Sequence, residues 1–269
     1  MPLIIPILAL SLILSTSVFA TDDKAIEYSY RVIASYPHNS NLFTQGLIFH
    51  DNALYESAGL YAASRLIKRK LDNIKPDTQH HLDQYFFAEG ITLLNDRLYQ
   101  LTWKSEQGFI YDPDSLNQIG RFKIKGQGWG LTTDGQQLIM SNGSASLLFI
   151  NPNTFDISKK ITVTLNGQPL NNLNELEWVN GYIYANVWNS NTIVLINPNH
   201  GKVEASVDFS GLLDPKLTTR YTNVLNGIAF DQQQQRLFIT GKNWPRLFHV
   251  ELIHKASEKN SSTTQLPQP

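Results

Sequence analysis

The chain has 269 residues, of which 42% are hydrophobic and 17% charged, and its formal net charge is −1. This composition is that of a globular protein with enough apolar material for a core, and the near-neutral charge gives no reason to expect a nucleic acid or an anionic membrane as a partner. The absence of cysteine excludes disulfides, thiolate catalysis and cysteine-based zinc sites.

Residues 1–20 are predicted to be a signal peptide. Residues 2–14 are apolar, and the small side chains of Val18 and Ala20 fit a signal-peptidase site before Thr21. The alternative is an uncleaved membrane anchor, for which the apolar run is short. We therefore expect a periplasmic or secreted protein that is free of the membrane after cleavage. Its single domain would span residues 21–255, and we expect it to be a monomer.

Residues 26–33 alternate between apolar and polar side chains and are predicted to form a strand. A repeated unit follows this strand. Its aligned anchor positions, separated by 44, 40, 45 and 52 residues, are Gly46, Gly90, Gly130, Glu175 and Gly227. An apolar residue follows each anchor, and after a polar turn comes a strand pair: Leu54-Tyr55, Leu98-Tyr99, Leu138-Ile139, Ile183-Tyr184 and Leu237-Phe238.

Three of the repeats continue with a third strand that ends in an Asp-Pro or Asn-Pro turn, at Pro113, Pro152 and Pro198. A fourth strand follows, for example at residues 118–124. A period of this size with strand–turn–strand content is typical of β-propeller blades. The sequence therefore predicts an all-β, five-bladed propeller with four-stranded antiparallel blades. The last repeat supplies only about three strands, so the strand at residues 26–33 is expected to complete it. Residues 256–269 are polar and are predicted to be a disordered tail.

Two columns of the repeat alignment vary in chemical type and are candidates for a functional site. The position before each anchor is occupied by Gln45, Glu89, Trp129, Asn174 and Asn226. A position at the far end of the second strand is occupied by Gly59, Trp103, Gly143, Trp188 and Lys242. Because the second strand is antiparallel to the first, both columns are expected at the same mouth of the central channel, with Phe43 and Phe87 nearby.

These columns predict a site for a small, partly apolar ligand that forms hydrogen bonds. Glu89 is the only acid in its column, which makes it the candidate catalytic group. The alternative is that the tryptophans pack between blades as part of the core.

Eight motifs in order resemble the plant-type and bacterial glutaminyl-peptide cyclotransferases, over roughly residues 36 to 252. They are Phe43-Thr44-Gln45-Gly46-Leu47, Leu54-Tyr55-Glu56-Ser57, Glu89-Gly90, Gln100-Leu101-Thr102-Trp103, Gly128-Trp129-Gly130-Leu131, Asn174-Glu175-Leu176-Glu177-Trp178, Ala185-Asn186-Val187-Trp188 and Thr240-Gly241-Lys242-Asn243-Trp244-Pro245. The chain departs from the usual family pattern at Asn39, Ala88 and Asn142.

The resemblance implies a five-bladed propeller that cyclises the amino-terminal glutamine of peptides or proteins to pyroglutamate and releases ammonia. By the same resemblance, the catalytic positions are Glu89, Lys242 and Gln45. The substrate-binding positions are Phe43, Phe87, Trp103, Trp129, Asn174 and Trp188. It implies no metal and no cofactor, and the partner is a substrate with a free amino-terminal glutamine.

Two other functions are open on the residues alone. A calcium-dependent, lactonase-type propeller could use the oxygens of Glu89, Asn174 and Asn226 as ligands. A non-catalytic periplasmic propeller could use the same residues to bind the end of a peptide. Turnover of a glutamine peptide with and without a chelator separates the three hypotheses.

Overall fold

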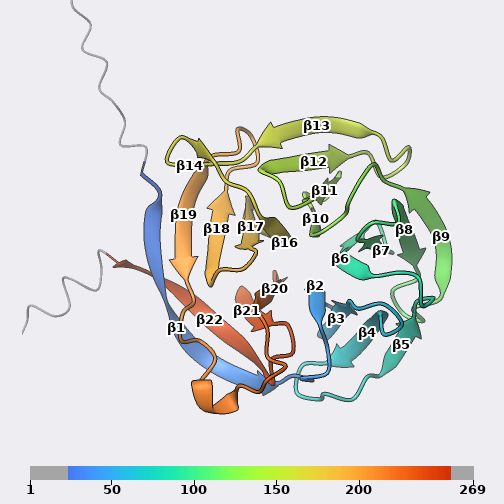
Figure 1. Ribbon diagram of the computed structural model, residues 1–269, viewed down its shortest axis with the longest axis horizontal. Helices are drawn as coiled ribbons and strands as arrows, with labels where there is room; N and C mark the ends of the chain where they lie inside the picture. Colours follow the sequence, from blue (N-terminus) through green and yellow to red (C-terminus); the bar gives the residue numbers. More distant parts are fainter. Residues whose placement is uncertain (1–23, 256–269) are drawn as a thin grey trace, which may run out of the picture.

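The computed structural model describes residues 24–255, which form an almost entirely β structure (Figure 1). The described residues include one short 3-10 helix, Pro215–Leu217. Within them, no helix has the length and apolar character needed to cross a membrane. The prediction of an all-β chain is confirmed, whereas the predicted signal peptide and carboxy-terminal tail lie outside the described residues.

Three sheets contain four strands each, in chain order and with antiparallel neighbours. The first contains β2 (Thr44–His50), β3 (Ala53–Ala58), β4 (Arg65–Lys70) and β5 (Thr78–His81). The second contains β6 (Ala88–Leu94), β7 (Arg97–Thr102), β8 (Gln107–Tyr111) and β9 (Gln118–Lys123). The third contains β10 (Leu131–Thr133), β11 (Leu138–Met140), β12 (Ser146–Ile150) and β13 (Ile157–Thr162).

A larger sheet of eight strands has the order β16-β17-β18-β19-β1-β22-β21-β20. One part contains β16 (Leu173–Val179), β17 (Tyr182–Val187), β18 (Thr192–Ile196) and β19 (Val203–Asp208). The other contains β1 (Ile26–Pro37), β22 (Arg246–His254), β21 (Arg236–Gly241) and β20 (Leu225–Asp231). The short strands β14 (Thr164–Leu165) and β15 (Gln168–Pro169) pair with each other.

Strand β1 joins the two parts of the large sheet. From Tyr28 to Pro37 it runs antiparallel to β22, as predicted for the amino-terminal strand. Its first residues, Ile26–Tyr28, also pair in parallel with β19, which the sequence analysis did not predict. The parallel pairing is possible because a strand has two hydrogen-bonding edges and β1 is 12 residues long. The second edge of β1 is thereby covered at these three residues.

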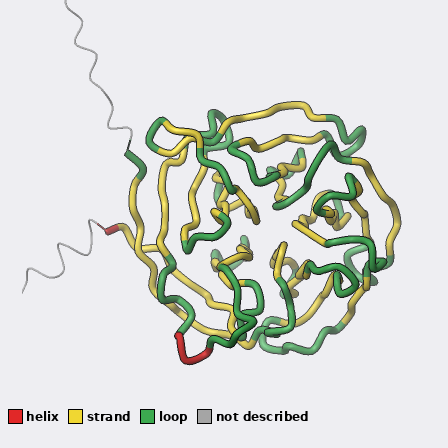
Figure 2. The backbone as a smooth tube through the Cα atoms, viewed as in Figure 1, coloured by secondary structure: helices red, strands yellow, loops and turns green. Residues whose placement is uncertain are grey.

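The sheets are arranged around a central axis, with β2, β6, β10, β16 and β20 innermost and strands such as β9, β13, β19 and β1 at the rim (Figures 1 and 2). The inner strands pack against one another in a closed ring, because β2 contacts both β6 and β20 and the others contact their neighbours in turn. Strand β20 is buried at every position, whereas β13 is buried at one position. The hydrophobic core therefore lies between the sheets and toward the axis.

The anchors of the sequence repeat lie where neighbouring inner strands approach most closely. A Cβ atom added to Gly46 would lie 2.6 Å from the backbone nitrogen of Ile91 in the next sheet. The same addition at Gly90 would meet the backbone of Leu131, and at Gly130 the backbone of Asn174. Glycine is needed at these points because any side chain would collide with a neighbouring backbone.

The pairing of β2, β6, β16 and β20 with their neighbours is interrupted by register shifts at the anchors, for example between Ala88 and Ile91. A β-bulge of this kind redirects the side chain of the extra residue and is frequent beside functional sites. At these four anchors, the preceding residue falls in the bulge. The bulge therefore sets the direction of the side chains in the predicted first column.

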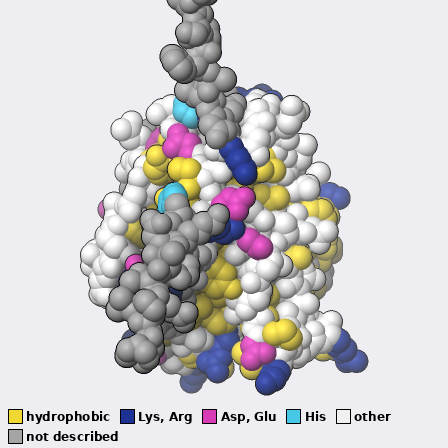
Figure 3. Space-filling model, turned by 90° about the vertical axis from the view of Figure 1, so that its left-hand side faces the viewer, with side chains coloured by type: hydrophobic (Ala, Val, Ile, Leu, Met, Phe, Trp, Pro, Cys, Tyr) yellow, Lys and Arg dark blue, Asp and Glu magenta, His cyan; other side chains and the backbone are white. Residues whose placement is uncertain are grey.

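Figure 3 shows the side of the molecule that carries the rim of the large sheet. Acidic and basic side chains are interspersed on this face among uncharged polar ones, and hydrophobic side chains form small separate patches. This mixed surface agrees with the formal net charge of −1.

The close approach at Gly46 predicts that Gly46→Ala destabilises the fold by about 1–3 kcal/mol or more, because the added methyl group meets backbone that cannot move aside. The measurement is the free energy of unfolding in urea. Gly120→Ala in β9 is the matched control, since its Cβ would lie 3.3 Å from the movable Cδ1 of Ile110. Equal effects of the two substitutions would contradict this account of the anchors.

Candidate functional site

Five polar side chains gather at the inner ends of the repeats, and we call them the polar cluster: Gln45, Glu89, Asn174, Asn226 and Lys242. All five are buried. The first four lie at the anchor bulges of β2, β6, β16 and β20. Lys242 follows β21 directly, and its backbone is held by hydrogen bonds with Val224 and Asn223 just before β20.

Glu89 and Lys242 interact electrostatically within this cluster. Burial raises the pKa of Glu89 well above its ordinary value, and the positive charge of Lys242 acts in the opposite direction. Burial lowers the pKa of Lys242 to about 8, and here the charge of Glu89 opposes the shift. Both groups can therefore change protonation state closer to neutral pH than the same groups in water.

Five aromatic side chains form a second group, the aromatic cluster: Phe43, Phe87, Trp103, Trp129 and Trp188. The ring of Phe87 lies edge-to-face against Phe43 at 6.2 Å and against Trp103 at 5.6 Å. Trp129 and Trp188 make a similar contact at 5.8 Å. These residues are partly exposed, and Trp188 has 45% of its surface accessible. The aromatic cluster therefore lies nearer to solvent than the buried polar cluster.

The two clusters meet at Lys242, whose Nζ lies 4.7 Å from the centre of the Phe43 ring. A cation at this distance is attracted by the face of the ring. Gln45 joins the cluster through Asn226, whose Nδ2 lies 3.5 Å from Gln45 Oε1, at the limit of a hydrogen bond. The structure thus links most of the predicted site residues through direct contacts.

Gln127 is a contact that the sequence analysis missed. Its side-chain oxygen accepts hydrogen bonds from the indole nitrogens of both Trp103, at 2.8 Å, and Trp129, at 3.1 Å. Gln127 thereby connects aromatic residues that come from two different sheets. Its position two residues before Trp129 in a glycine-rich loop was a signal that could have singled it out. Tyr61, which contacts Phe87 at 5.4 Å, carries no comparable signal.

Three amide atoms near the polar cluster have no hydrogen-bond partner among the described residues: Oδ1 of Asn174, Oδ1 of Asn226 and Nδ2 of Asn186. All three are buried, and buried amide groups are nearly always paired. Asn226 uses its other amide atom to donate to the backbone oxygen of Thr44 at 2.9 Å. Two acceptors and one donor are therefore available to a ligand.

Two further carboxyl groups lie inside the ring, although the sequence analysis identified Glu89 alone as the acid of the site. The two side-chain oxygens of Glu175 accept hydrogen bonds from the backbone nitrogens of Leu47, at 3.3 Å, and Ile228, at 2.9 Å. Glu177 accepts one from the backbone nitrogen of Phe230 at 2.9 Å. Glu175 connects β16 to β2 and β20, and Glu177 connects it to β20, which indicates a structural role.

The described residues contain no group of three or more His, Asp or Glu side chains that could hold a metal ion. A cavity of about 460 Å³ lies at the opposite ends of the inner strands, lined by residues 48–52, 132–135 and 230–233 among others. It contains none of the predicted site residues. We place the site at the polar cluster because a proton acceptor, a cation and unpaired amides converge there.

Three comparisons connect this chain to known proteins. The family model described as Glutamine cyclotransferase matches residues 5–252. A glutaminyl-peptide cyclotransferase from Arabidopsis thaliana is 40% identical over 235 residues, which are 86% of this chain and 73% of that protein. The crystal structure of a glutaminyl cyclase from Myxococcus xanthus is similar with a TM-score of 0.80 and 36% identity, covering 86% of this chain and 99% of the other.

The buried carboxyl groups predict a pH dependence of stability. Burial raises the pKa of Glu177 from 4.5 to about 8, so between these values the folded protein holds a proton that the unfolded chain releases. The free energy of unfolding should therefore fall as pH rises through this window, by up to about 1.4 kcal/mol per pH unit for one group. Glu177→Gln cannot titrate, and its stability should depend less on pH in urea denaturation between pH 5 and 8. The exposed Glu251→Gln is the control, and the same slope in all three proteins would contradict the prediction.

Proposed function

The chain belongs to the glutamine cyclotransferase family, and we propose that it converts an amino-terminal glutamine to pyroglutamate with Glu89 as the group that carries the proton. The observation that carries this assignment is the electrostatic interaction of buried Glu89 with buried Lys242, whose Nζ lies against the Phe43 ring of the aromatic cluster. A carboxyl group, a cation and aromatic rings match the amine, the carbonyl oxygen and the apolar side-chain carbons of a glutamine.

In the proposed reaction, the α-amine nitrogen of the substrate attacks the carbon of its own side-chain amide. A carbon–nitrogen bond forms in a five-membered ring, and the bond to the amide nitrogen breaks. One proton leaves the attacking amine and one is added to the departing nitrogen, so ammonia is released and no net proton is consumed. Glu89 takes up the first proton and delivers the second.

The raised pKa of Glu89 supports this role, because a carboxylate with a raised pKa accepts a proton from the substrate amine more readily than one in water. The α-amine of a peptide has a pKa of about 7.7–8.0, so its proton is removed easily near neutral pH. In water a glutamate would be too weak a base for an efficient transfer. Burial strengthens it as a base and lets it act as an acid in the second step.

Lys242, Gln45 and Asn174 are proposed to bind the polar atoms of the substrate. Charge develops on the amide oxygen as the ring closes, and a buried cation stabilises such an oxyanion. Lys242 fits this task because it lies beside Glu89 and its lowered pKa of about 8 leaves it charged at neutral pH. The unpaired Oδ1 of Asn174 is suited to accept a hydrogen bond from a substrate nitrogen.

The aromatic cluster is proposed to hold the glutamine side chain folded back on the amine. The rings make pairwise edge-to-face contacts, Phe43 and Trp103 with Phe87 and Trp129 with Trp188. A reactive conformer held by such rings would lose little further entropy on reaction. The remaining residues of the peptide would extend into solvent. The substrate must therefore be a peptide or protein with a free amino-terminal glutamine.

We count the fold as a five-bladed propeller, with β16–β19 as one blade and β20, β21, β22 and β1 as the last. The closed ring of inner strands supports this count.

We also propose that residues 1–20 are a signal peptide, that the enzyme is periplasmic or secreted, and that it acts as a monomer without a metal or cofactor. Proteomic identification of the mature amino terminus tests the first of these proposals.

Glu89→Gln tests the proposed role of the carboxyl group. It should lower kcat by about 10²–10⁴-fold, the usual contribution of a general acid–base group, and leave folding and peptide binding intact. Ammonia release from a Gln-initial peptide measures the rate. Glu177→Gln is the matched control, because that carboxyl is equally buried but lies outside the polar cluster. A near-normal kcat for Glu89→Gln would remove Glu89 from the mechanism.

The choice of substrate provides a separate test. A Glu-initial peptide should react far more slowly than a Gln-initial one, because its ionised carboxylate is a poor electrophile and brings a second negative charge toward Glu89. An acetyl-Gln peptide should not react, since its nitrogen is no longer a nucleophile. Rates are compared at several pH values by mass spectrometry. Comparable rates for Gln and Glu at neutral pH, or turnover of the acetylated peptide, would show that the nucleophile is misassigned.

A further inference from the structure

Two loops at opposite ends of the chain are fastened together beside the polar cluster. The first precedes β2 and ends at Phe43, and the second follows β21 and begins at Lys242. The backbone nitrogen of His38 donates to the oxygen of Pro245 at 3.0 Å, and that of Asn243 donates to the oxygen of Leu42 at 2.8 Å. The side chain of Asn243 adds a hydrogen bond to the backbone oxygen of Ser40 at 2.9 Å.

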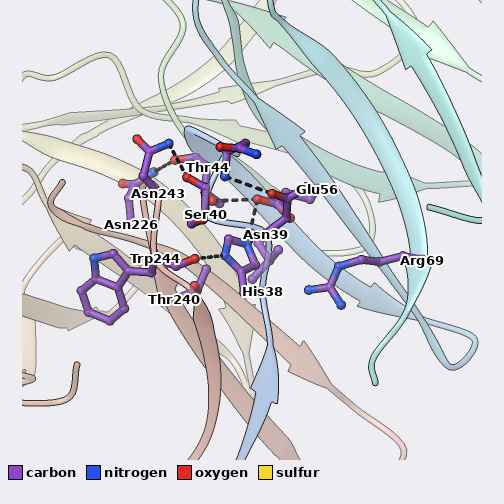
Figure 4. A network of polar contacts seen from close by, with 12 residues as sticks. His38, Asn39, Ser40, Thr44, Glu56, Arg69, Asn226, Thr240, Asn243 and Trp244 are labelled. Atoms are coloured by element: carbon purple, nitrogen blue, oxygen red, sulfur yellow. Dashed lines mark hydrogen bonds and ion pairs between the residues drawn. The ribbon is translucent and has the colours of Figure 1, made fainter. Parts of the chain in front are cut away.

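The imidazole of His38 makes a further connection between these loops (Figure 4). Its Nδ1 lies 2.6 Å from the backbone oxygen of Trp244, and its Nε2 lies 3.0 and 3.2 Å from the two side-chain oxygens of Glu56. Glu56 also accepts a hydrogen bond of 2.7 Å from the hydroxyl of Thr44. The side chains of His38 and Glu56 are completely buried.

The partners of the imidazole fix where its protons lie. A backbone carbonyl can only accept, so Nδ1 carries a hydrogen and donates it to Trp244. Burial alone would raise the pKa of Glu56, but the charge and hydrogen bond of His38, the charge of Arg69 and the hydroxyl of Thr44 together lower it. Glu56 is therefore a carboxylate, and both of its oxygens lie within hydrogen-bond distance of Nε2. His38 and Glu56 form a buried contact between the first loop and β3.

We propose that His38 is a positioning residue that fixes the loop carrying Lys242 and thereby holds Lys242 between Glu89 and Phe43. The proposal rests on the proposed function, in which Lys242 stabilises the oxyanion. Lys242 lies two residues before Trp244, so the hydrogen bond from Nδ1 acts on the backbone that carries it. The other end of the network acts on the first loop, since Thr44 lies between Phe43 and Gln45.

A buried polar contact is a costly way to join two loops, because a carboxylate and an imidazole must be removed from water. Well-packed apolar residues would hold the loops together at least as firmly. The contacts of His38 fix the orientation of its imidazole, since each ring nitrogen faces one acceptor group at a defined position. A fixed orientation is useful here because Lys242 must be held in a defined position relative to the carboxyl group of Glu89 and the ring of Phe43.

Two substitutions separate the contact to Trp244 from the contact to Glu56. In His38→Asn, the side-chain nitrogen stands close to the position of Nδ1 and can still donate to the Trp244 carbonyl. In His38→Gln, it stands close to Nε2 and can still donate to Glu56, but the Trp244 contact is lost. Both substitutions replace the imidazole by a neutral amide, so the loss of the ring itself is common to the two variants.

If His38 positions Lys242, His38→Gln should lower kcat by about tenfold to a hundredfold, the effect of a misplacement of about 1 Å. His38→Asn should keep most of the activity. The acid limb of the pH profile of kcat/KM should also move to higher pH in His38→Gln, because a displaced Lys242 no longer lowers the pKa of Glu89. Ammonia release from a Gln-initial peptide, measured from pH 5 to 10, gives both quantities.

A measurement that does not depend on activity completes the test. Competitive acetylation followed by mass spectrometry reports the pKa of Lys242, which is about 8 in the unaltered protein and should rise in His38→Gln as the side chain reaches water. If the unaltered enzyme were inactive on the peptide, the proposed function would fail, and the acetylation result would still decide the role of His38.

Tyr111→Phe is the structural control. It removes a buried hydrogen bond of 2.8 Å between the Tyr111 hydroxyl and Gln100, which touches none of the site residues. This substitution should lower the melting temperature and leave kcat and the pH profile unchanged. Equal kcat values for His38→Asn and His38→Gln, together with an unchanged pKa of Lys242, would overturn the proposal and reduce His38 to a stabilising residue.

Discussion

The convergence of the inner strands on a common axis is the constraint on which the rest of the structure depends. At Gly46, Gly90 and Gly130 the backbone of one sheet lies so close to the next that a single methyl group cannot be accommodated. Register shifts interrupt the strand pairing at the anchors of β2, β6, β16 and β20, and two of these anchors, Gly46 and Gly90, are also points of close approach. The bulges redirect the side chains that precede the anchors, and four of these side chains belong to the polar cluster.

Glu175 shows how the ring accommodates an exception to this pattern. Where the other repeats have glycine, β16 has a long side chain whose carboxyl group accepts hydrogen bonds from Leu47 in β2 and Ile228 in β20. Burial and the neighbouring Glu177 raise its pKa, whereas the two backbone N–H groups act to lower it. The group is satisfied by hydrogen bonds rather than by a cation. Glu89 differs from Glu175 because its charged neighbour is Lys242. This difference makes Glu89 the acid suited to chemistry and Glu175 the acid suited to a structural role.

The sequence predicted the parts of the fold that depend on local pattern. The strand pairs at Leu98-Tyr99 and Ile183-Tyr184 lie in β7 and β17, because alternation and turn residues report a strand from a few neighbouring positions. The gathering of the polar cluster was also predictable, since a repeat places equivalent positions at equivalent points. The parallel pairing of β1 with β19 was not predictable in this way, because nothing in a strand's own sequence identifies its second neighbour. The contacts of Gln127 and His38 depend on distant side chains and carry no periodic signal.

The candidate site is assembled from residues that are far apart in the chain. Its polar cluster and its aromatic cluster depend on different contacts between the repeats. Glu89 belongs to the second sheet and Lys242 follows β21, with Phe43 of the first loop against Lys242. Glu89 and Lys242 therefore lie on either side of the first repeat, and their separation depends on the closure of the ring between the first and last repeats. Trp129 and Trp188 lie in neighbouring repeats away from that closure and contact each other directly. A loosened closure would separate Glu89 from Lys242 and leave this aromatic contact in place, so the proposed proton carrier and the proposed side-chain binding site depend on different contacts.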